Sequence, residues 1–247
     1  MSQPVPKRHT IAAGLVLMRQ GERGDRAWLI ESGELEILLT TPAGTRRLGT
    51  VGRGAVVGEM ALIDDGARSA TVRALTEVAC VEVTRDAFRG LLKKCPPLAS
   101  YLLQSLIAAI RRDYGLPTPE PMGGGADIRS TNSYQKIVDR RMFRQGYVFF
   151  HPGETAAAAY LIQSGQVSIE RRTGERVEEA ALLGPGQMFG ELAVMTGRPQ
   201  DSVAVAAVGT ICEVIRRESL LEVLATMPPI LRSLAKIYVE QLARGRG

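Results

Sequence analysis

The sequence is poor in the residues that most often hold metals or form cross-links. Its two histidines, His9 and His151, are too few for the histidine cluster of a metal-dependent cupin in either half of the chain. The three cysteines are an odd number without CxxC spacing, which argues against a zinc site and a disulfide framework. They are Cys80, Cys95 and Cys212. The pattern predicts a protein of the reducing cytoplasm.

Long apolar runs are also missing. The longest near the start, residues 11–18, falls well short of the roughly 20 residues that a membrane-spanning helix needs. No clear small-residue cleavage site follows it, so the run does not fit a secretory signal. These absences exclude a transmembrane reading and favour a cytoplasmic protein.

The charge balance is less informative. The net charge is +5, and residues 1–114 hold 16 Lys+Arg against 12 Asp+Glu. This excess suits an anionic ligand, and it equally suits an ordinary mixed surface. With 247 residues, the chain has room for one domain or two.

An internal repeat indicates two domains. Sliding the chain against itself by 132 residues brings short motifs into register over more than eighty positions. The matches include Gly21 and Glu22 with Gly153 and Glu154, Ser32 and Gly33 with Ser164 and Gly165, Gly58 and Glu59 with Gly190 and Glu191, Cys80 with Cys212, and Pro96 and Pro97 with Pro228 and Pro229. Paired residues in constant register are not expected by chance. The chain therefore reads as two copies of one domain.

A segment rich in proline and glycine separates the copies. It begins at residue 115 and has no apolar periodicity, as expected of a linker. We therefore expect a first domain at residues 1–114, a linker at 115–131 and a second domain at 132–247.

Each copy is predicted to be a small antiparallel β-roll followed by helices. Leu35 and Ile37 alternate with Glu34 and Glu36 after a Ser-Gly turn, which is typical of a half-buried strand. Residues 71–75 and 78–83 are further strand candidates. Helices are expected at 86–94 and 98–112, separated by the Pro pair, and at 218–226 and from residue 230 in the second copy. The predicted fold class is mainly β with helices, two jelly-roll barrels in tandem.

The best candidate site lies between two of these elements in the first copy. A glycine that opens a helical turn lets backbone N–H groups approach an anion, and an arginine ten residues later can return to the same point. Gly58 and Arg68 have this spacing. Glu59 would repel a phosphate, but its carboxylate suits a sugar hydroxyl. A phosphate together with a ribose indicates a nucleotide.

Both copies resemble cyclic-nucleotide-binding domains, the jelly-roll modules of the catabolite activator protein and of the regulatory subunits of cyclic-AMP-dependent protein kinase. Residues 57–62, Val-Gly-Glu-Met-Ala-Leu, and 67–71, Ala-Arg-Ser-Ala-Thr, are similar to the family's phosphate-binding motif. The resemblance implies that Glu59 holds the ribose 2′-hydroxyl and that Arg68 pairs with the cyclic phosphate of cAMP or cGMP. The implied ligand-binding set is Gly58, Glu59, Met60, Ala61, Arg68, Ser69 and Ala70.

The resemblance also implies that residues 98–112 form a helix that covers the base. Tyr101 or a neighbour would stack on it. The sequence leaves open whether the base is adenine or guanine, since Ser69 fits both.

The second copy departs from the motif at its arginine. It keeps Gly190, Glu191, Leu192 and Ala193, but Gln200 takes the place of Arg68, with Asp201 beside it. A charge-assisted hydrogen bond contributes about 1.5–3 kcal/mol, so its loss weakens binding about ten- to a hundredfold. We expect a degenerate second site, with Arg198 two positions early as the alternative cation.

Other protein classes fit less well. The histidine count excludes a cupin enzyme, and neither histidine has the spacing of a catalytic triad. We expect no DNA-reading domain and no kinase pseudosubstrate, because the residues after the last helix and before the first copy are too few. The sequence therefore predicts a sensor without enzymatic activity or cofactor. It would bind a cyclic nucleotide in domain 1 and signal through helix movement to an effector protein, with a homodimer possible. The alternative is a ligand-independent adaptor.

Overall fold

The structure is a computed structural model that describes residues 7–117, 138–173 and 176–244. The chain divides into two compact units. Unit 1 contains the described residues within Met1–Lys94 and Ile107–Glu120, and unit 2 contains those within Cys95–Leu106 and Pro121–Gly247. Most of the expected linker, from residue 118 onward, lies outside the described residues.

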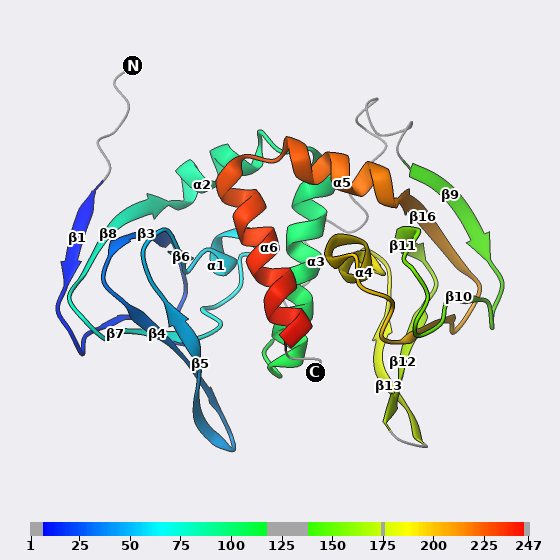
Figure 1. Cartoon of the computed structure of the whole chain (residues 1–247), viewed down its shortest axis with the longest axis horizontal. Coiled ribbons are helices and arrows are strands. Elements are labelled where there is room, and N and C mark those ends of the chain that lie inside the picture. Colours follow the sequence, from blue (N-terminus) through cyan, green and yellow to red (C-terminus); the bar gives the residue numbers. More distant parts are fainter. Residues whose placement is uncertain (1–6, 118–137, 174–175, 245–247) are drawn as a thin grey trace. The chain divides into compact units, whose positions relative to one another are not determined.

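Unit 1 contains an antiparallel roll, called here the first roll (Figure 1). One sheet has the strand order β1-β8-β3-β6 and the other has β2-β7-β4-β5. The strands are β1 (Arg8–Ile11), β2 (Val16–Met18), β3 (Arg26–Ser32), β4 (Leu35–Thr41), β5 (Gly44–Val51), β6 (Val56–Val57), β7 (Thr71–Ala74) and β8 (Val78–Thr84). The short helix α1 (Met60–Ile63) stands between β6 and β7.

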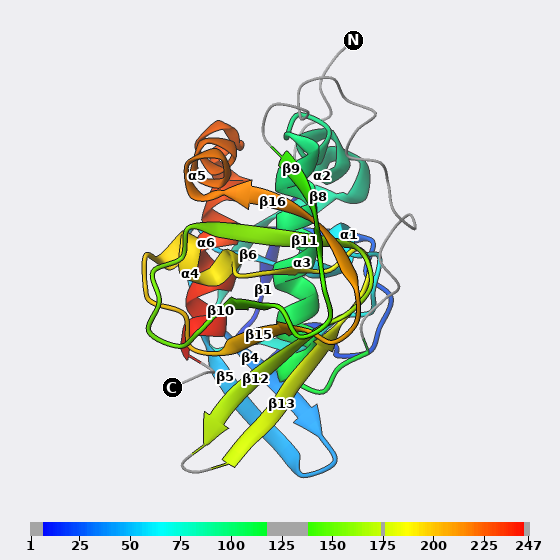
Figure 2. The ribbon, with the colours of Figure 1, turned by 90° about the vertical axis from the view of Figure 1, so that its right-hand side faces the viewer.

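Unit 2 repeats this plan in the second roll, seen side-on in Figure 2. Its sheets have the orders β14-β11-β16-β9 and β10-β15-β12-β13. The strands are β9 (Val138–Phe143), β10 (Val148–Phe150), β11 (Ala158–Ser164), β12 (Val167–Thr173), β13 (Arg176–Leu183), β14 (Met188–Phe189), β15 (Val203–Ala206) and β16 (Thr210–Arg216), with α4 (Glu191–Thr196) after β14. Every element of the first roll has its counterpart at the predicted offset.

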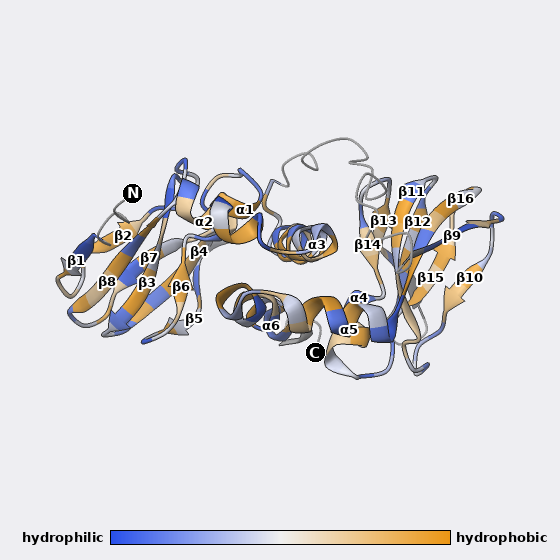
Figure 3. Cartoon of the chain, turned by 90° about the horizontal axis from the view of Figure 1, so that it is seen from above, coloured by the Kyte–Doolittle hydropathy of each residue, from blue (hydrophilic) through white to orange (hydrophobic). Residues whose placement is uncertain are grey.

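The interior of each roll explains its strand pattern. Hydrophobic and hydrophilic segments both occur along the strands of each roll in Figure 3, as expected where side chains alternate between the two faces of a sheet. In the first roll the core includes Trp28, Ile30, Leu35 and Val72, all buried. In the second roll, aromatic rings take part, with Phe143, Phe150 and Phe189 buried. The Ser-Gly turns need glycine, since a Cβ at Gly33 (φ +86°) would overlap the Glu77 carbonyl oxygen.

The helices begin and end within two residues of the predicted positions. For the last helix only the start was predicted. They are α2 (Arg85–Leu92), α3 (Pro97–Asp113), α5 (Arg217–Thr226) and α6 (Pro229–Arg244). The Thr84 side chain caps α2 by accepting from the Ala87 N–H. Pro97 and Pro229 each begin a helix, where a missing N–H costs no hydrogen bond. The proline pairs therefore separate two helices in each half rather than ending the domain.

Two further findings concern the whole described chain. None of the helices in the described ranges is both long and apolar enough to span a membrane. The three cysteines are free and buried, and burial raises the pKa of the Cys212 thiol to about 12. A thiol with such a pKa is a poor nucleophile at neutral pH.

Candidate functional site

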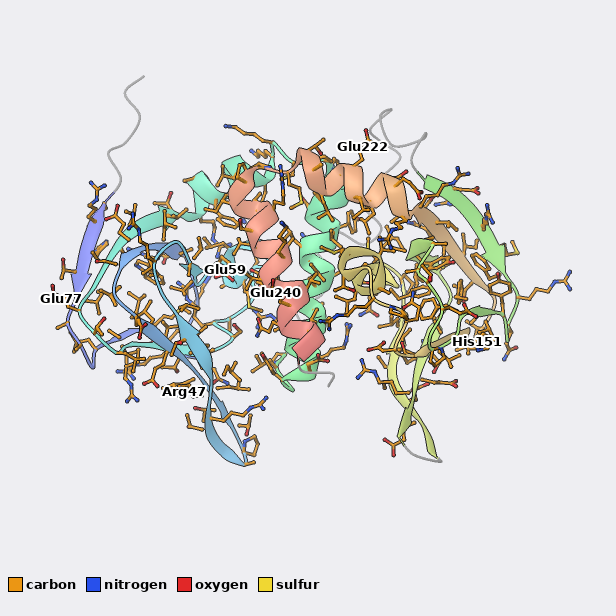
Figure 4. All side chains as sticks on the ribbon, viewed as in Figure 1. Arg47, Glu59, Glu77, His151, Glu222 and Glu240 are labelled. Carbon is orange, nitrogen blue, oxygen red and sulfur yellow. The ribbon has the colours of Figure 1, made fainter. Side chains whose placement is uncertain are left out.

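The site in the first roll begins at the end of β6. Gly58 adopts the left-handed conformation (φ +81°) and turns the chain into α1. Glu59 stands at the N-cap position of this helix and is only 7% exposed. Figure 4 labels Glu59 beside α1. An ionised carboxylate only accepts hydrogen bonds, so Glu59 brings an acceptor into the buried part of the site.

Arg68 reaches the same place from the other side. Its backbone is fixed by two hydrogen bonds, from the Gly21 N–H to its carbonyl (2.9 Å) and from its own N–H to the Glu22 carbonyl (2.8 Å). The side chain points inward and is 5% exposed. Its Nη1 donates to the Gly58 carbonyl (2.6 Å), and its Nη2 donates to the Arg26 carbonyl (2.7 Å). The predicted partners Gly58, Glu59 and Arg68 are therefore brought together.

The electrostatics of Arg68 favour an anionic ligand. Burial lowers the pKa of the guanidinium from its usual value, and the carboxylates of Asp25, Glu59 and Glu22 act in the opposite direction. The guanidinium lies over the Trp28 ring, 5.1 Å from its centroid. An arginine has five N–H donors, and the two carbonyls use only part of them. A buried, charged donor set of this kind suits a phosphate.

Two glycines make room for this arginine. A Cβ at Gly24 would lie 2.6 Å from Arg68 Cζ, and a Cβ at Gly58 would lie 2.5 Å from Arg68 Nη1. Any larger residue at either position therefore displaces the guanidinium. Gly24 was not part of the predicted site.

We expect Gly58→Ala to weaken cyclic-nucleotide binding strongly. The new methyl group would push the guanidinium away from its carbonyl partner and strain the left-handed backbone, which costs about 1–2 kcal/mol by itself. Gly54→Ala is the matched control, since Gly54 has φ +85° but nothing within 4 Å of the added Cβ. Calorimetric titration should show reduced affinity for Gly58→Ala alone. Equal affinities in the two variants would contradict this role of Gly58.

The remaining predicted residues line the same region. Ala61 and Ala70 are buried, and the Ser69 hydroxyl donates to the Met60 sulfur (3.3 Å). This contact joins α1 to the segment before β7 that carries Arg68. Tyr101 lies on the part of α3 that belongs to unit 2, and its role in covering the base remains a prediction.

A buried ion pair, which sequence reasoning missed, holds the loop before Arg68. Arg111 near the end of α3 is 2% exposed and donates through Nε to Asp64 Oδ2 (2.6 Å) and through Nη2 to Asp64 Oδ1 (3.2 Å). The same Nη2 donates to the Ala67 carbonyl (2.8 Å). Arg111 thus ties α3 to both ends of the loop at residues 64–67.

Breaking this pair from one side should destabilise the first roll. Arg111→Met leaves the Asp64 carboxylate buried without its cation, a change that typically costs about 3–5 kcal/mol. The double variant Asp64→Leu with Arg111→Met removes both charges, and we expect it to recover much of that loss. Urea unfolding of the three proteins measures the effect. A single variant as stable as the unmodified protein would show that the pair is not needed for stability.

The second roll keeps the backbone of this site. The Gly153 N–H donates to the Gln200 carbonyl (2.9 Å), and the Gln200 N–H donates to the Glu154 carbonyl (2.9 Å), as at Arg68. Gly190 is left-handed (φ +77°) and caps α4, while Glu191 is 5% exposed. Leu192 is half-buried and Ala193 buried in α4. Gln200 is buried in the place that Arg68 occupies in the first roll.

The residues that surround Arg68 in the first roll are also replaced around Gln200 in the second. At the offset of 132 residues, Gly24, Asp25 and Arg26 correspond to residues 156–158, which are all alanine. Ala156 is 3% exposed, and its Cβ corresponds to the one that on Gly24 would lie 2.6 Å from Arg68 Cζ. The second roll therefore lacks the arginine and has a methyl group where the first roll has a glycine beside it.

Two charged residues lie near this region of the second roll. Asp201 is exposed and approaches Arg171 of β12, with 3.9 Å between Asp201 Oδ2 and Arg171 Nη2. Arg198 is also exposed, whereas Gln200 faces inward. In the described conformation Arg198 therefore does not replace the missing guanidinium.

Comparisons with known proteins agree with this description. The sequence model of the family "Cyclic nucleotide-binding domain" matches residues 8–95 and 140–227. The chain is 29% identical over 201 residues to a cAMP-dependent protein kinase type II regulatory subunit of Drosophila melanogaster, covering 81% of this chain and 50% of that protein. It is 26% identical over 223 residues to a cGMP-dependent protein kinase of Eimeria tenella. This match covers 90% of this chain and 20% of that protein.

The chain thus spans half or less of the length of these curated relatives. Among solved structures, the regulatory domain of Toxoplasma gondii PKA with cAMP is 23% identical, with a TM-score of 0.39, over 95% of this chain and 86% of that chain.

Proposed function

The chain belongs to the cyclic nucleotide-binding domain family, with one copy in each half, and from this membership we propose that it is a sensor of cAMP or cGMP. The ligand binds in the first roll. Glu59 accepts hydrogen bonds from the ribose, and Arg68 pairs with the cyclic phosphate. The second roll does not bind a cyclic phosphate in this way.

The observation that carries the proposal is the contrast at one position. In the first roll the guanidinium of Arg68 is buried in space that Gly24 and Gly58 leave open. In the second roll a buried amide, that of Gln200, stands at the same backbone position beside Ala156. A buried cation without a ligand is costly to maintain, so its presence with a built cradle supports a role in anion binding.

The output is a change in α3. Because Arg111 joins α3 to the loop before Arg68, a ligand that shifts this loop also shifts the position of α3. We propose that α3 passes the change to an effector protein without catalysis by this chain. The names of the relatives suggest a protein kinase as the class of effector.

Calorimetric titration with cAMP and with cGMP tests the proposal. We expect saturable binding of at least one of the two, together with altered amide hydrogen exchange in residues 107–113 of α3. If neither nucleotide binds at millimolar concentration, the chain is a ligand-independent adaptor instead.

A further inference from the structure

Two strands that stand last in their sheets carry opposite charge. Strand β5 ends the order β2-β7-β4-β5, and β13 ends the order β10-β15-β12-β13. At the offset of 132 residues, Arg46 and Arg47 of β5 correspond to Glu178 and Glu179 of β13. All four residues are exposed. The same position of the roll therefore carries two cations in one unit and two anions in the other.

The outer edges of both strands can accept a further strand. Among the described residues, β5 pairs only with β4, and β13 pairs only with β12, in hairpins that extend from the rolls (Figure 1). Such an edge presents backbone N–H and C=O groups to another chain. The register shifts between Ile37 and Leu38 in one hairpin and at the equivalent place, between Ile169 and Glu170, in the other. The two edges therefore match in backbone geometry and differ in charge.

The arginines of β5 keep donors for a carboxylate. Their partners across the ladder are Leu39 for Arg46 and Leu38 for Arg47, so β4 supplies no anion there. The Arg46 guanidinium lies over the Tyr114 ring, 5.6 Å from its centroid, and this stacking leaves the N–H groups at its rim available. Neither arginine forms an ion pair with any residue that the structure describes.

The glutamates of β13 are incompletely balanced within their own sheet. Glu179 accepts from the Ser168 hydroxyl (2.9 Å) but lies directly opposite Glu170 in the register. Like charges in such a pair destabilise a sheet. Glu178 lies opposite Arg171, and the ion pair of that arginine is with a different carboxylate. Cations on an added strand would offset this negative charge.

The charges oppose pairing between like edges and favour pairing between unlike ones. Two β5 edges would bring arginines together, and two β13 edges would bring glutamates together. We propose that β5 of one chain pairs with β13 of a second copy of this chain, with Arg46 and Arg47 against Glu178 and Glu179. Long side chains also reach diagonal neighbours, so the charges match in more than one register. This interface is separate from the nucleotide site and does not rest on the proposed function.

Sedimentation equilibrium of the full chain tests the interface. At an ionic strength of about 0.01 M we expect self-association with a Kd below about 1 mM. At about 1 M, where the Debye length is only about 3 Å, the association should be at least about threefold weaker because the ion pairs are screened.

Exchanging the charges makes the test specific. The acidic-edge variant, Arg46→Glu with Arg47→Glu, has glutamates on both strands, and the basic-edge variant, Glu178→Arg with Glu179→Arg, has arginines on both. We expect each variant alone to be monomeric and their equimolar mixture to associate as the unmodified protein does. Lys93→Glu with Lys94→Glu is the matched control. It reverses two exposed cations that follow α2, away from both edges, and should associate normally.

Several results would overturn the inference. They are a monomeric unmodified protein at about 1 mM, normal association of either edge variant alone, and a mixture of the two that stays monomeric. A chain that pairs its own β5 and β13 also stays monomeric and would contradict it. Arg68→Ala should associate as the unmodified protein does, so a failure of the proposed function is distinguishable from a failure of this interface. Circular dichroism melting shows whether each variant is folded.

Discussion

Arg68→Ala is expected to reduce the affinity for the cyclic nucleotide by about a hundredfold. Arg68 is the buried cation of the first roll's site, and each charge-assisted hydrogen bond that it makes to the phosphate contributes about 1.5–3 kcal/mol. Each 1.4 kcal/mol corresponds to a factor of ten in the dissociation constant, so losing one or two such bonds accounts for the effect. The affinity of Arg68→Lys should fall between those of the unmodified protein and Arg68→Ala. Its ammonium group keeps the positive charge but lacks the planar pair of N–H donors of a guanidinium.

The control for this variant lies at the same place in the second roll. Gln200→Ala removes a buried polar side chain at the equivalent backbone position, and we expect it to leave cyclic-nucleotide affinity unchanged. Unfolding in urea should accompany the titrations, so that a loss of affinity is not confused with a loss of fold. An Arg68→Ala protein that binds as tightly as the unmodified one would show that the phosphate is held elsewhere.

Rebuilding the second roll as a phosphate site should require three changes rather than one. Gln200→Arg alone places a guanidinium where the Ala156 side chain already stands, and the corresponding Cβ in the first roll would lie only 2.6 Å from Arg68 Cζ. It also buries a cation without the carboxylate that acts most strongly on Arg68, because Ala157 takes the place of Asp25. We expect this single variant to be less stable and to gain no second site.

The triple variant Ala156→Gly, Ala157→Asp and Gln200→Arg should behave differently. It restores the open space and the nearby carboxylate found at Gly24 and Asp25, and the carbonyls of Gly190 and Ala158 correspond to the two acceptors of Arg68. We expect it to raise the cyclic-nucleotide stoichiometry measured by calorimetry from one per chain to two. If Gln200→Arg alone gave two sites, the argument from space at position 156 would be wrong.

Local motifs explain which features the sequence could predict. The tandem repeat, the helices around the proline pairs and the grouping of Gly58, Glu59 and Arg68 all follow from short motifs or constant spacing. The structure confirms the predicted fold class, two mainly β rolls followed by helices. Strand β5 escaped prediction, because Arg46, Arg47 and their neighbours are exposed and show no alternation between buried and exposed positions. Arg47 lies on the β4–β5 hairpin, away from the labelled Glu59 (Figure 4).

Features that depend on contacts between residues far apart in the sequence could not be predicted. Gly24 matters because a side chain 44 residues later folds against it, and a glycine in a loop gives no such sign by itself. The Asp64–Arg111 pair joins residues 47 positions apart, and Arg111 reads in the sequence as an ordinary charge near a helix end. The loss of room at Ala156 becomes meaningful only once the cradle of Arg68 is known. Local patterns therefore locate the candidate site, and tertiary contacts explain why we expect only the first copy to bind a cyclic phosphate.

The number of cyclic-nucleotide molecules bound per chain tests the central claim most directly. Equilibrium dialysis of the unmodified protein against labelled cAMP and cGMP at saturating concentration gives this number. It needs neither a measurable heat of binding nor an effector protein. The account predicts one site per chain for the unmodified protein. At a ligand concentration about ten times the Kd of the unmodified protein, a hundredfold loss of affinity leaves Arg68→Ala with roughly a tenth of a site per chain. Two sites per chain, or one site that survives Arg68→Ala, would contradict it.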